Sequence, residues 1–203
     1  MIPTAMGAHH LGFNVPDLDF AIAWYERVMG AETVFLWGPF EDPEGTAIAD
    51  KLHVHPRTSV KGAILRLGAT FNVELVEWHS PDEATAPPRN NYLGATHFAI
   101  RVADLDAAVA VLQKLFEERE ITWLGTPGPM ADGQPHTGLR NVFFETPFGQ
   151  LIELDEYGPM PYERFTTARV WNADTAPWSN SHPTDAAPPP PGTGNSPAFP
   201  GQA

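Results

Sequence analysis

HLGFNVPDLDFAIAW, residues 10–24, and HFAIRVADLDAAVAV, residues 97–111, are two versions of one pattern. They align at a constant offset of 87 residues, the difference between positions 10 and 97, and this frame pairs two histidines, two valines and two Asp-Leu-Asp triplets. Matches this numerous in one frame indicate an internal repeat, which has to be recognised before any element is assigned.

A second pair of similar segments follows later in each copy. NVELVEW, residues 72–78, aligns with LIELDEY, residues 151–157, and pairs Glu74 with Glu153 at an offset of 79 residues, the difference between those two positions. The drop from 87 to 79 places about eight extra residues in the first copy, which we locate in the irregular segment 37–58. This insertion is either a lid over a cavity or a plain surface loop with a short helix.

Each copy predicts the element order βαβββ. A short alternating or apolar run predicts the opening strand, and an Asp-rich N-cap then leads into apolar residues at helical spacing. Gly30 is expected to end the first helix. Three further strands are expected after each helix, at Glu32–Leu36, Lys61–Leu67 and Asn72–Trp78 in the first copy and at Ile121–Gly125, Arg140–Glu145 and Gln150–Tyr157 in the second. The fold class is therefore α+β, with two tandem modules.

The repeat also divides the chain. We place the first module at residues 8–80 and the second at 92–158. Residues 159–185 contain aromatic side chains and are expected to form an extension that packs on the body. Residues 186–203 are rich in Pro, Gly and small residues, so we expect a flexible tail there.

Composition limits the partners. With 203 residues, 42% of them hydrophobic, the chain can bury a core as one domain or two small ones. A formal net charge of −13 argues against nucleic acid, because the average surface repels a polyanion. The chain lacks a run of about 18 apolar residues and a secretory N-terminus, so we expect a soluble, cytoplasmic protein with no membrane partner. Without cysteine, any metal must be held by imidazole and carboxylate.

Two histidines and two glutamates recur in register, and we predict that His10, Glu74, His97 and Glu153 bind one divalent metal ion. If the modules pack with approximate twofold symmetry, each contributes one imidazole and one carboxylate to a common cavity. Two nitrogens and two oxygens with open positions left over suit a six-coordinate ion. Any one of these residues alone would more often be structural or solvated, so the prediction depends on the repetition.

Other ionisable residues near these positions receive different interpretations. His9 has the opposite strand parity from His10 and is the alternative ligand. His53 and His55 are expected in an exposed loop, because Pro56 follows them. Glu77 and its repeat partner Glu156 also have the opposite parity from the predicted ligands, and we expect both to be solvated.

These residues make the chain resemble the vicinal oxygen chelate superfamily, which contains glyoxalase I, extradiol dioxygenases and drug resistance proteins. The resemblance spans about residues 8–157 and is carried by HHLGFNVPDLDFAIAWYERVMG, NVELVEW, THFAIRVADLDAAV and FFETPFGQLIELDEY. It implies a cupped, incompletely closed mixed sheet around one ion, often in a homodimer. The order His, Glu, His, Glu is similar to that of glyoxalase I, and the ion is then Ni, Co, Mn, Fe or Zn.

The strand ends beside the ligands suggest a substrate site. Strand parity aims Asn14 and Trp78 in the first module, and Arg101 and Tyr157 in the second, at the same cavity as the ligands. Arg101 is expected to pair with an anionic substrate group, the alternative being an arginine that reaches solvent. The glyoxalase pattern tends to have an arginine that helps hold glutathione where this chain has Asn14, which argues against glutathione as a cosubstrate.

The predicted ion would chelate two neighbouring substrate oxygens and stabilise an enediolate, which favours a lyase or isomerase. Glu153 is the first candidate for general base and Glu74 the alternative. A ring-cleaving Fe(II) dioxygenase is the runner-up, because it normally has two histidines and one carboxylate as ligands and leaves more positions open. A third reading is a drug-binding protein without catalysis, for which Trp24, Trp37 and Trp78 would form an aromatic surface.

Overall fold

The computed structural model describes residues 8–42, 44, 47–69, 71–129 and 138–157. The predicted extension at 159–185 and the predicted tail at 186–203 lie outside the described residues.

The expected βαβββ unit is present twice. The first module consists of β1 (Leu11–Asn14), α1 (Leu18–Met29), β2 (Glu32–Glu41), α2 (Ala47–Leu52), β3 (Ser59–Leu67) and β4 (Phe71–His79). The second consists of β5 (His97–Arg101), α3 (Leu105–Glu117), β6 (Thr122–Pro129), β7 (Leu139–Glu145) and β8 (Leu151–Tyr157). The short helix α2 lies in the insertion of the first module. The predicted α+β class with two tandem modules is confirmed.

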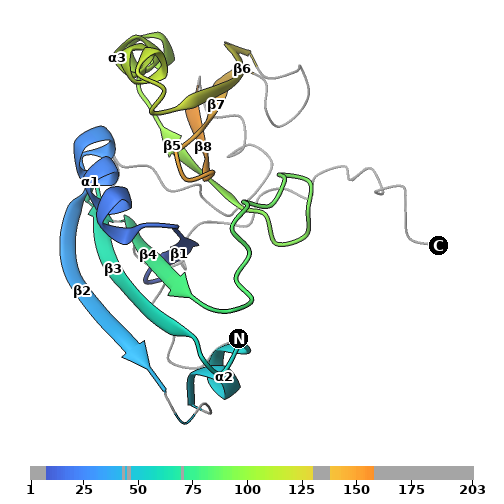
Figure 1. Cartoon of the computed structure of the whole chain (residues 1–203). Coiled ribbons are helices and arrows are strands. Elements are labelled where there is room, and N and C mark those ends of the chain that lie inside the picture. The colour runs from blue at the N-terminus through green and yellow to red at the C-terminus, as the bar shows by residue number, and fades with distance from the viewer. Residues whose placement is uncertain (1–7, 43, 45–46, 70, 130–137, 158–203) are drawn as a thin grey trace, which may run out of the picture.

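Each module folds into a four-stranded mixed sheet, and the two sheets do not close into a barrel (Figure 1). The strand orders are β1-β4-β3-β2 and β5-β8-β7-β6, with the opening strand parallel to the last strand and the other pairs antiparallel. Gly12 is the Cα partner of Glu74, and Ala99 is the Cα partner of Glu153. The two sheets therefore carry the repeated residues in the same register.

The helices begin as the sequence predicts. Asp17 accepts a hydrogen bond from the amide of Phe20 at 2.9 Å, and Asp104 accepts one from the amide of Ala107 at 2.9 Å. Each aspartate thus caps amides that lack an intrahelical partner. Gly30 ends α1 with a positive φ of 63°, a conformation that glycine adopts without steric cost. No helix in the described part of the chain is long and apolar enough to cross a membrane.

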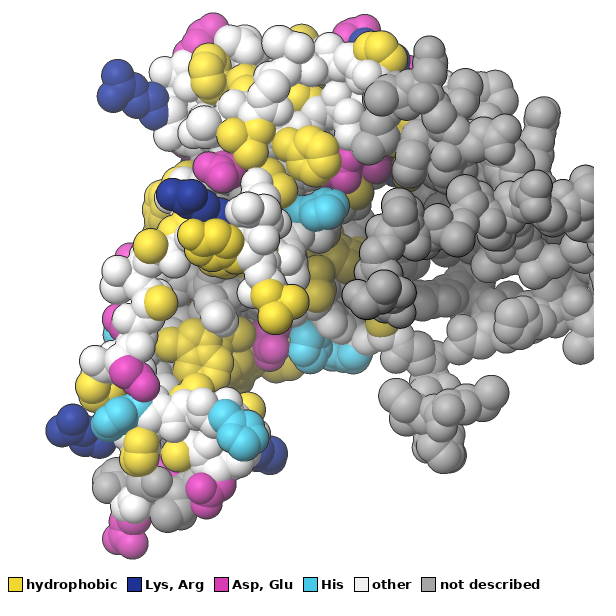
Figure 2. Space-filling view, turned by 90° about the vertical axis from the view of Figure 1, so that its right-hand side faces the viewer, with side chains coloured by type: hydrophobic (Ala, Val, Ile, Leu, Met, Phe, Trp, Pro, Cys, Tyr) yellow, Lys and Arg dark blue, Asp and Glu magenta, His cyan; other side chains and the backbone are white. Residues whose placement is uncertain are grey.

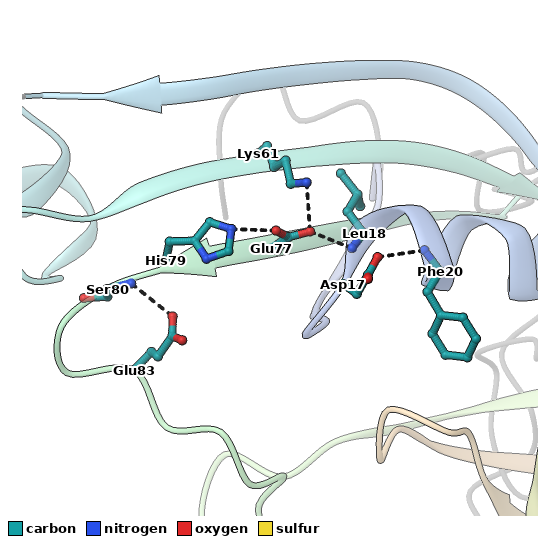
Figure 3. A network of polar contacts seen from close by, with 8 residues as sticks. All are labelled: Asp17, Leu18, Phe20, Lys61, Glu77, His79, Ser80 and Glu83. Atoms are coloured by element: carbon teal, nitrogen blue, oxygen red, sulfur yellow. Dashed lines mark hydrogen bonds and ion pairs between the residues drawn. The ribbon is translucent and has the colours of Figure 1, made fainter.

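Glu77 is buried, so the expectation that it is solvated was wrong. Its carboxylate accepts hydrogen bonds from the Leu18 amide at 2.6 Å and from His79 at 2.6 Å, and it lies 3.0 Å from Lys61 Nζ (Figure 3). Burial raises the pKa of Glu77, but these donors outweigh it and leave the pKa below its ordinary value. The face opposite the predicted ligands meets the N-terminus of α1, whose free amides attract a carboxylate.

Glu156 repeats this arrangement in the second module, where its side chain is 27% exposed and thus half-buried rather than fully solvated. Its Oε2 accepts hydrogen bonds from the Leu105 amide at 2.7 Å and from Arg140 at 3.2 Å. Arg140 occupies the place that Lys61 has in the first module. Both glutamates thus stabilise the first turn of the helix in their own module.

The two modules share one apolar core. It is formed by the helix-facing sides of both sheets together with α1 and α3. Phe13 of β1 lies 5.5 Å from Phe98 of β5 between ring centroids, and Trp24 of α1 lies 5.5 Å from Phe148 of the second module. Tyr25 of α1 donates a hydrogen bond to Gln150. The contact between Phe13 and Phe98 shows that the opening strands β1 and β5 lie close together.

Candidate metal and substrate site

One predicted pair of ligands forms in the first module. His10 directly precedes β1 and Glu74 lies on β4, and the parallel pairing of these strands brings them to the same face. His10 Nε2 lies 3.2 Å from Glu74 Oε2. The side chains are 35% and 23% exposed, so a small molecule can reach both.

The second pair forms at the equivalent place. His97 Nε2, on β5, lies 3.4 Å from Glu153 Oε2, on β8. The other oxygen of this glutamate, Oε1, accepts a hydrogen bond of 2.6 Å from Asn141 Nδ2 of β7. Phe143 packs edge-on against the His97 ring, with 5.7 Å between the centroids. The glutamate side chain is 10% exposed and the histidine 50% exposed.

The spacing within each pair fits two neighbouring ligands of one ion. Two donor atoms at right angles, each about 2.1 Å from a metal, lie about 3 Å apart, close to the separations of 3.2 and 3.4 Å seen here. In the described residues, however, no three His, Asp or Glu side chains come together as one group. The structure thus brings the four predicted ligands together as two pairs.

Figure 2 gives a view of one face of the molecule. Figure 2 shows histidine and acidic side chains in both the upper and the lower part of this face, with hydrophobic side chains between them. A site shared by both pairs would lie between the two modules, because each module contributes one pair.

The four predicted substrate-binding residues also form one pair in each module. Trp78 Nε1 donates a hydrogen bond of 2.8 Å to Asn14 Oδ1. The Arg101 guanidinium lies over the ring of Tyr157, 5.6 Å from its centroid. Each residue lies four positions after a predicted ligand, along one strand in three cases and from His10, directly before β1, in the case of Asn14. The spacing places each on the same face as that ligand.

Asp155 and Asn141 are polar residues of this site that the repeat does not predict. Asp155 lies two positions after Glu153 on the same face and is only 5% exposed. Burial, and then the charge and contact of Glu153, raise the pKa of Asp155 to about 7. Its Oδ1 has no hydrogen-bond partner among the described residues. Strand parity alone would have placed Asp155 here, but a search for repeated residues passes over it.

Other histidines in the described part of the chain have different surroundings. His9 Nδ1 lies 2.7 Å from His10 Nδ1, and its carbonyl accepts a hydrogen bond from Asn72, so it supports its neighbour. His53 and His55 lie in the loop after α2, as expected. Among the tryptophans, Trp24 is 1% exposed and belongs to the core.

Comparison with known proteins gives the family. A family model described as "Glyoxalase/Bleomycin resistance protein/Dioxygenase superfamily" matches residues 9–117, more than half of the chain. The chain belongs to this superfamily. The resemblance inferred from the repeated phrases is thus confirmed.

Individual superfamily members cover most of the chain. A protein named 2-epi-5-epi-valiolone epimerase, from Actinomyces sp., is 37% identical over 180 residues, which is 88% of this chain and 94% of that protein. The structure of a glyoxalase family protein from Bacillus cereus matches with a TM-score of 0.56 at 20% identity, covering 78% of this chain and 99% of that one. A glyoxalase family protein from Enterococcus faecalis matches with a TM-score of 0.51 at 21% identity, covering 74% and 98%. The two structures establish the superfamily fold.

Proposed function

We propose that this protein is a divalent-metal-dependent isomerase that epimerises a small α-hydroxyketone at a carbon next to the carbonyl group. The observation that carries the proposal is the His–Glu pair that recurs in both modules, 3.2 Å apart in the first and 3.4 Å apart in the second. The Actinomyces relative, 37% identical over 88% of this chain, supports epimerisation rather than lyase or dioxygenase chemistry.

The ion would be held by His10, Glu74, His97 and Glu153. Each pair has the spacing of adjacent ligands, and a common shell would require the two pairs to converge on one ion. Nitrogen and carboxylate donors suit Ni, Co, Mn, Fe or Zn. When bound, such an ion would supply positive charge that stabilises a developing enediolate.

The protein's carboxylates move the proton. One of them removes the proton from the carbon next to the carbonyl, the electron pair of the C–H bond enters the enediolate, and return of a proton to the opposite face inverts the centre. Glu74 and Glu153 come from different modules, and either one could act as the base, with water as the donor of the returning proton.

Polar groups at the strand ends would orient the substrate. Arg101 and Asn14 lie at equivalent positions of the two modules, and their side chains are already placed by contacts with Tyr157 and Trp78. A guanidinium and an amide can bind the carbonyl or hydroxyl oxygens that project from the ring or chain of a hydroxyketone. The aromatic partners supply apolar surface beside them.

We also infer that two chains form a homodimer through β2. This strand lies at the edge of its sheet and exposes large apolar side chains, among them Leu36 at 62%, Phe40 at 55% and Val34 at 53%. Exposed apolar edge strands tend to pair with another chain unless they are covered.

The experiment is a turnover assay with the metal-free protein reloaded separately with Mn, Co, Ni and Zn. The substrate is 2-epi-5-epi-valiolone in deuterated water, and NMR follows both the new epimer and deuterium at the carbon next to the ketone. We expect ion-dependent epimerisation that Glu74→Gln and Glu153→Gln each reduce by about 10²–10⁴-fold. Absence of epimerisation and of exchange with every ion would contradict the proposal.

A further inference from the structure

The two modules differ at one pair of equivalent strand positions. In the first module Gly62 of β3 is the Cα partner of Trp37 of β2, and in the second Asn141 of β7 is the Cα partner of Gly128 of β6. Gly62 and Asn141 correspond through the same offset that relates Glu74 to Glu153. A large residue thus stands opposite a glycine in both modules, but on opposite strands.

The indole of Trp37 fills the space over Gly62. A Cβ atom added at Gly62 would lie 2.3 Å from Trp37 Cζ2 and 2.6 Å from the Leu75 carbonyl oxygen, so no side chain fits there. At Gly128 the nearest heavy atom to an added Cβ is the Thr126 carbonyl oxygen at 3.9 Å. Among the described residues no side chain packs over Gly128 as the indole packs over Gly62.

This exchange makes the two metal-facing carboxylates unequal. Asn141 donates to Glu153 Oε1 at 2.6 Å, which leaves Oε2 directed at His97. Glu74 Oε2 is directed at His10 in the same way, but Gly62 has no side chain that could donate to Glu74. Glu74 is also more exposed, at 23% against 10%, and an added Cβ at Gly12 would lie 3.6 Å from its Oε2, an ordinary contact distance.

We infer that Asn141 is a positioning residue that keeps Glu153 as a permanent ligand, and that Glu74 is the carboxylate that moves between ion and substrate. This inference depends on the proposed metal-dependent epimerisation and reverses the order of bases expected from the sequence. Glu74 takes the proton from carbon, and the electron pair enters the enediolate. Water returns a proton to the opposite face, and the resulting hydroxide takes the proton from Glu74.

The test separates ion affinity from proton transfer. Co(II) binding is measured by calorimetry and by visible absorbance, and deuterium exchange into the ketone is measured at saturating Co(II). The variants are Asn141→Leu, Glu74→Gln and Glu153→Gln. Asn91→Leu, in the exposed segment between the modules, is the matched control. Thermal unfolding checks each variant, and Asn141→Gly, which installs the residue of the first module, replaces Asn141→Leu if that variant does not fold.

We expect Asn141→Leu to weaken Co(II) binding by about 10–100-fold, as loss of a partner behind a metal ligand usually does. Glu74→Gln should retain Co(II) affinity within about tenfold but lose about 10²–10⁴-fold in exchange. Glu153→Gln should lose more Co(II) affinity than Glu74→Gln, and Asn91→Leu should behave as wild type.

Two results would overturn the inference and leave the proposed function intact. One is an Asn141→Leu protein that binds Co(II) as tightly as wild type. The other is a larger loss of Co(II) affinity in Glu74→Gln than in Glu153→Gln. A wild-type protein that binds no ion would instead overturn the proposed function and this inference together. If the wild-type protein binds Co(II) but shows no deuterium exchange, the role of Glu74 is refuted. The Co(II) affinities of the variants would then still decide whether Glu153 is the fixed ligand.

Discussion

The backbone amide of Leu18, the first residue of α1, donates a 2.6 Å hydrogen bond to the carboxylate of Glu77 on β4. This bond ties the start of the helix to the last strand of its module. Figure 3 shows this contact between the first turn of α1 and Glu77. The same strand carries Glu74 on its other face, so the bond anchors the strand that bears a proposed metal ligand.

Replacing Glu77 should therefore destabilise the fold. Glu77→Gln keeps the shape of the side chain but removes the negative charge. This charge accepts hydrogen bonds from the Leu18 amide and His79 and pairs with Lys61. Hydrogen bonds to buried charged groups contribute about 1.5–3 kcal/mol each, so we expect a loss of about 2–4 kcal/mol in the free energy of unfolding. Urea denaturation measures it. Glu83→Gln, at an exposed turn, is the control and should change stability by less than about 0.5 kcal/mol.

Asp155 should make the metal-free protein less stable as pH rises. Its pKa is about 7 in the folded protein and about 3.9 in an unfolded chain. The folded state therefore binds the proton more tightly, and stability falls from about pH 4 to pH 7. Asp155→Asn removes this effect, so its advantage over wild type should grow by on the order of 2 kcal/mol between pH 5 and pH 8. Unfolding curves that differ equally at both pH values would show that Asp155 does not titrate in this range.

Arg101 should affect substrate binding more than the chemical step. Its guanidinium is held over Tyr157, on the face that carries His97. Arg101→Ala removes a charged donor, so we expect KM to rise by about 10–100-fold with a smaller change in kcat. Steady-state kinetics at saturating metal gives both values. An unchanged KM would mean that this side chain only reaches solvent.

A charge on β2 should disrupt the proposed dimer. Leu36→Lys places an ammonium group on an edge strand whose apolar side chains are exposed. We expect light scattering after gel filtration to show a dimer for wild type and mainly monomer for this variant. Val111→Lys, on α3 and 75% exposed, is the control and should leave the dimer intact. A monomeric wild-type protein would contradict the proposal directly.

The repeat was enough to predict both modules and the pairing of His10 with Glu74 and of His97 with Glu153. Strand ends were less predictable. β2 continues to Glu41 and β6 to Pro129, although Pro39 and Pro127 break the apolar pattern. Both strands lie at sheet edges, where a proline need not donate to a neighbouring strand.

Site residues that differ between the two modules could not be predicted from the repeat. Asn141 and Asp155 correspond to Gly62 and Val76, which have no polar side chain, so a search for conserved repeat positions gave no reason to select them. Glu77 and Glu156 do recur, but strand parity shows only which face a residue occupies. It does not show that a helix N-terminus covers that face.

The packing of Trp37 on Gly62 has a consequence for rebuilding the protein by gene duplication. A chain made of two first modules would lack the side-chain amide that Asn141 provides to Glu153. A chain made of two second modules would have this amide twice but would lack the indole of Trp37. The two halves are therefore not interchangeable, and only a hybrid of both can reproduce the surroundings of the two glutamates.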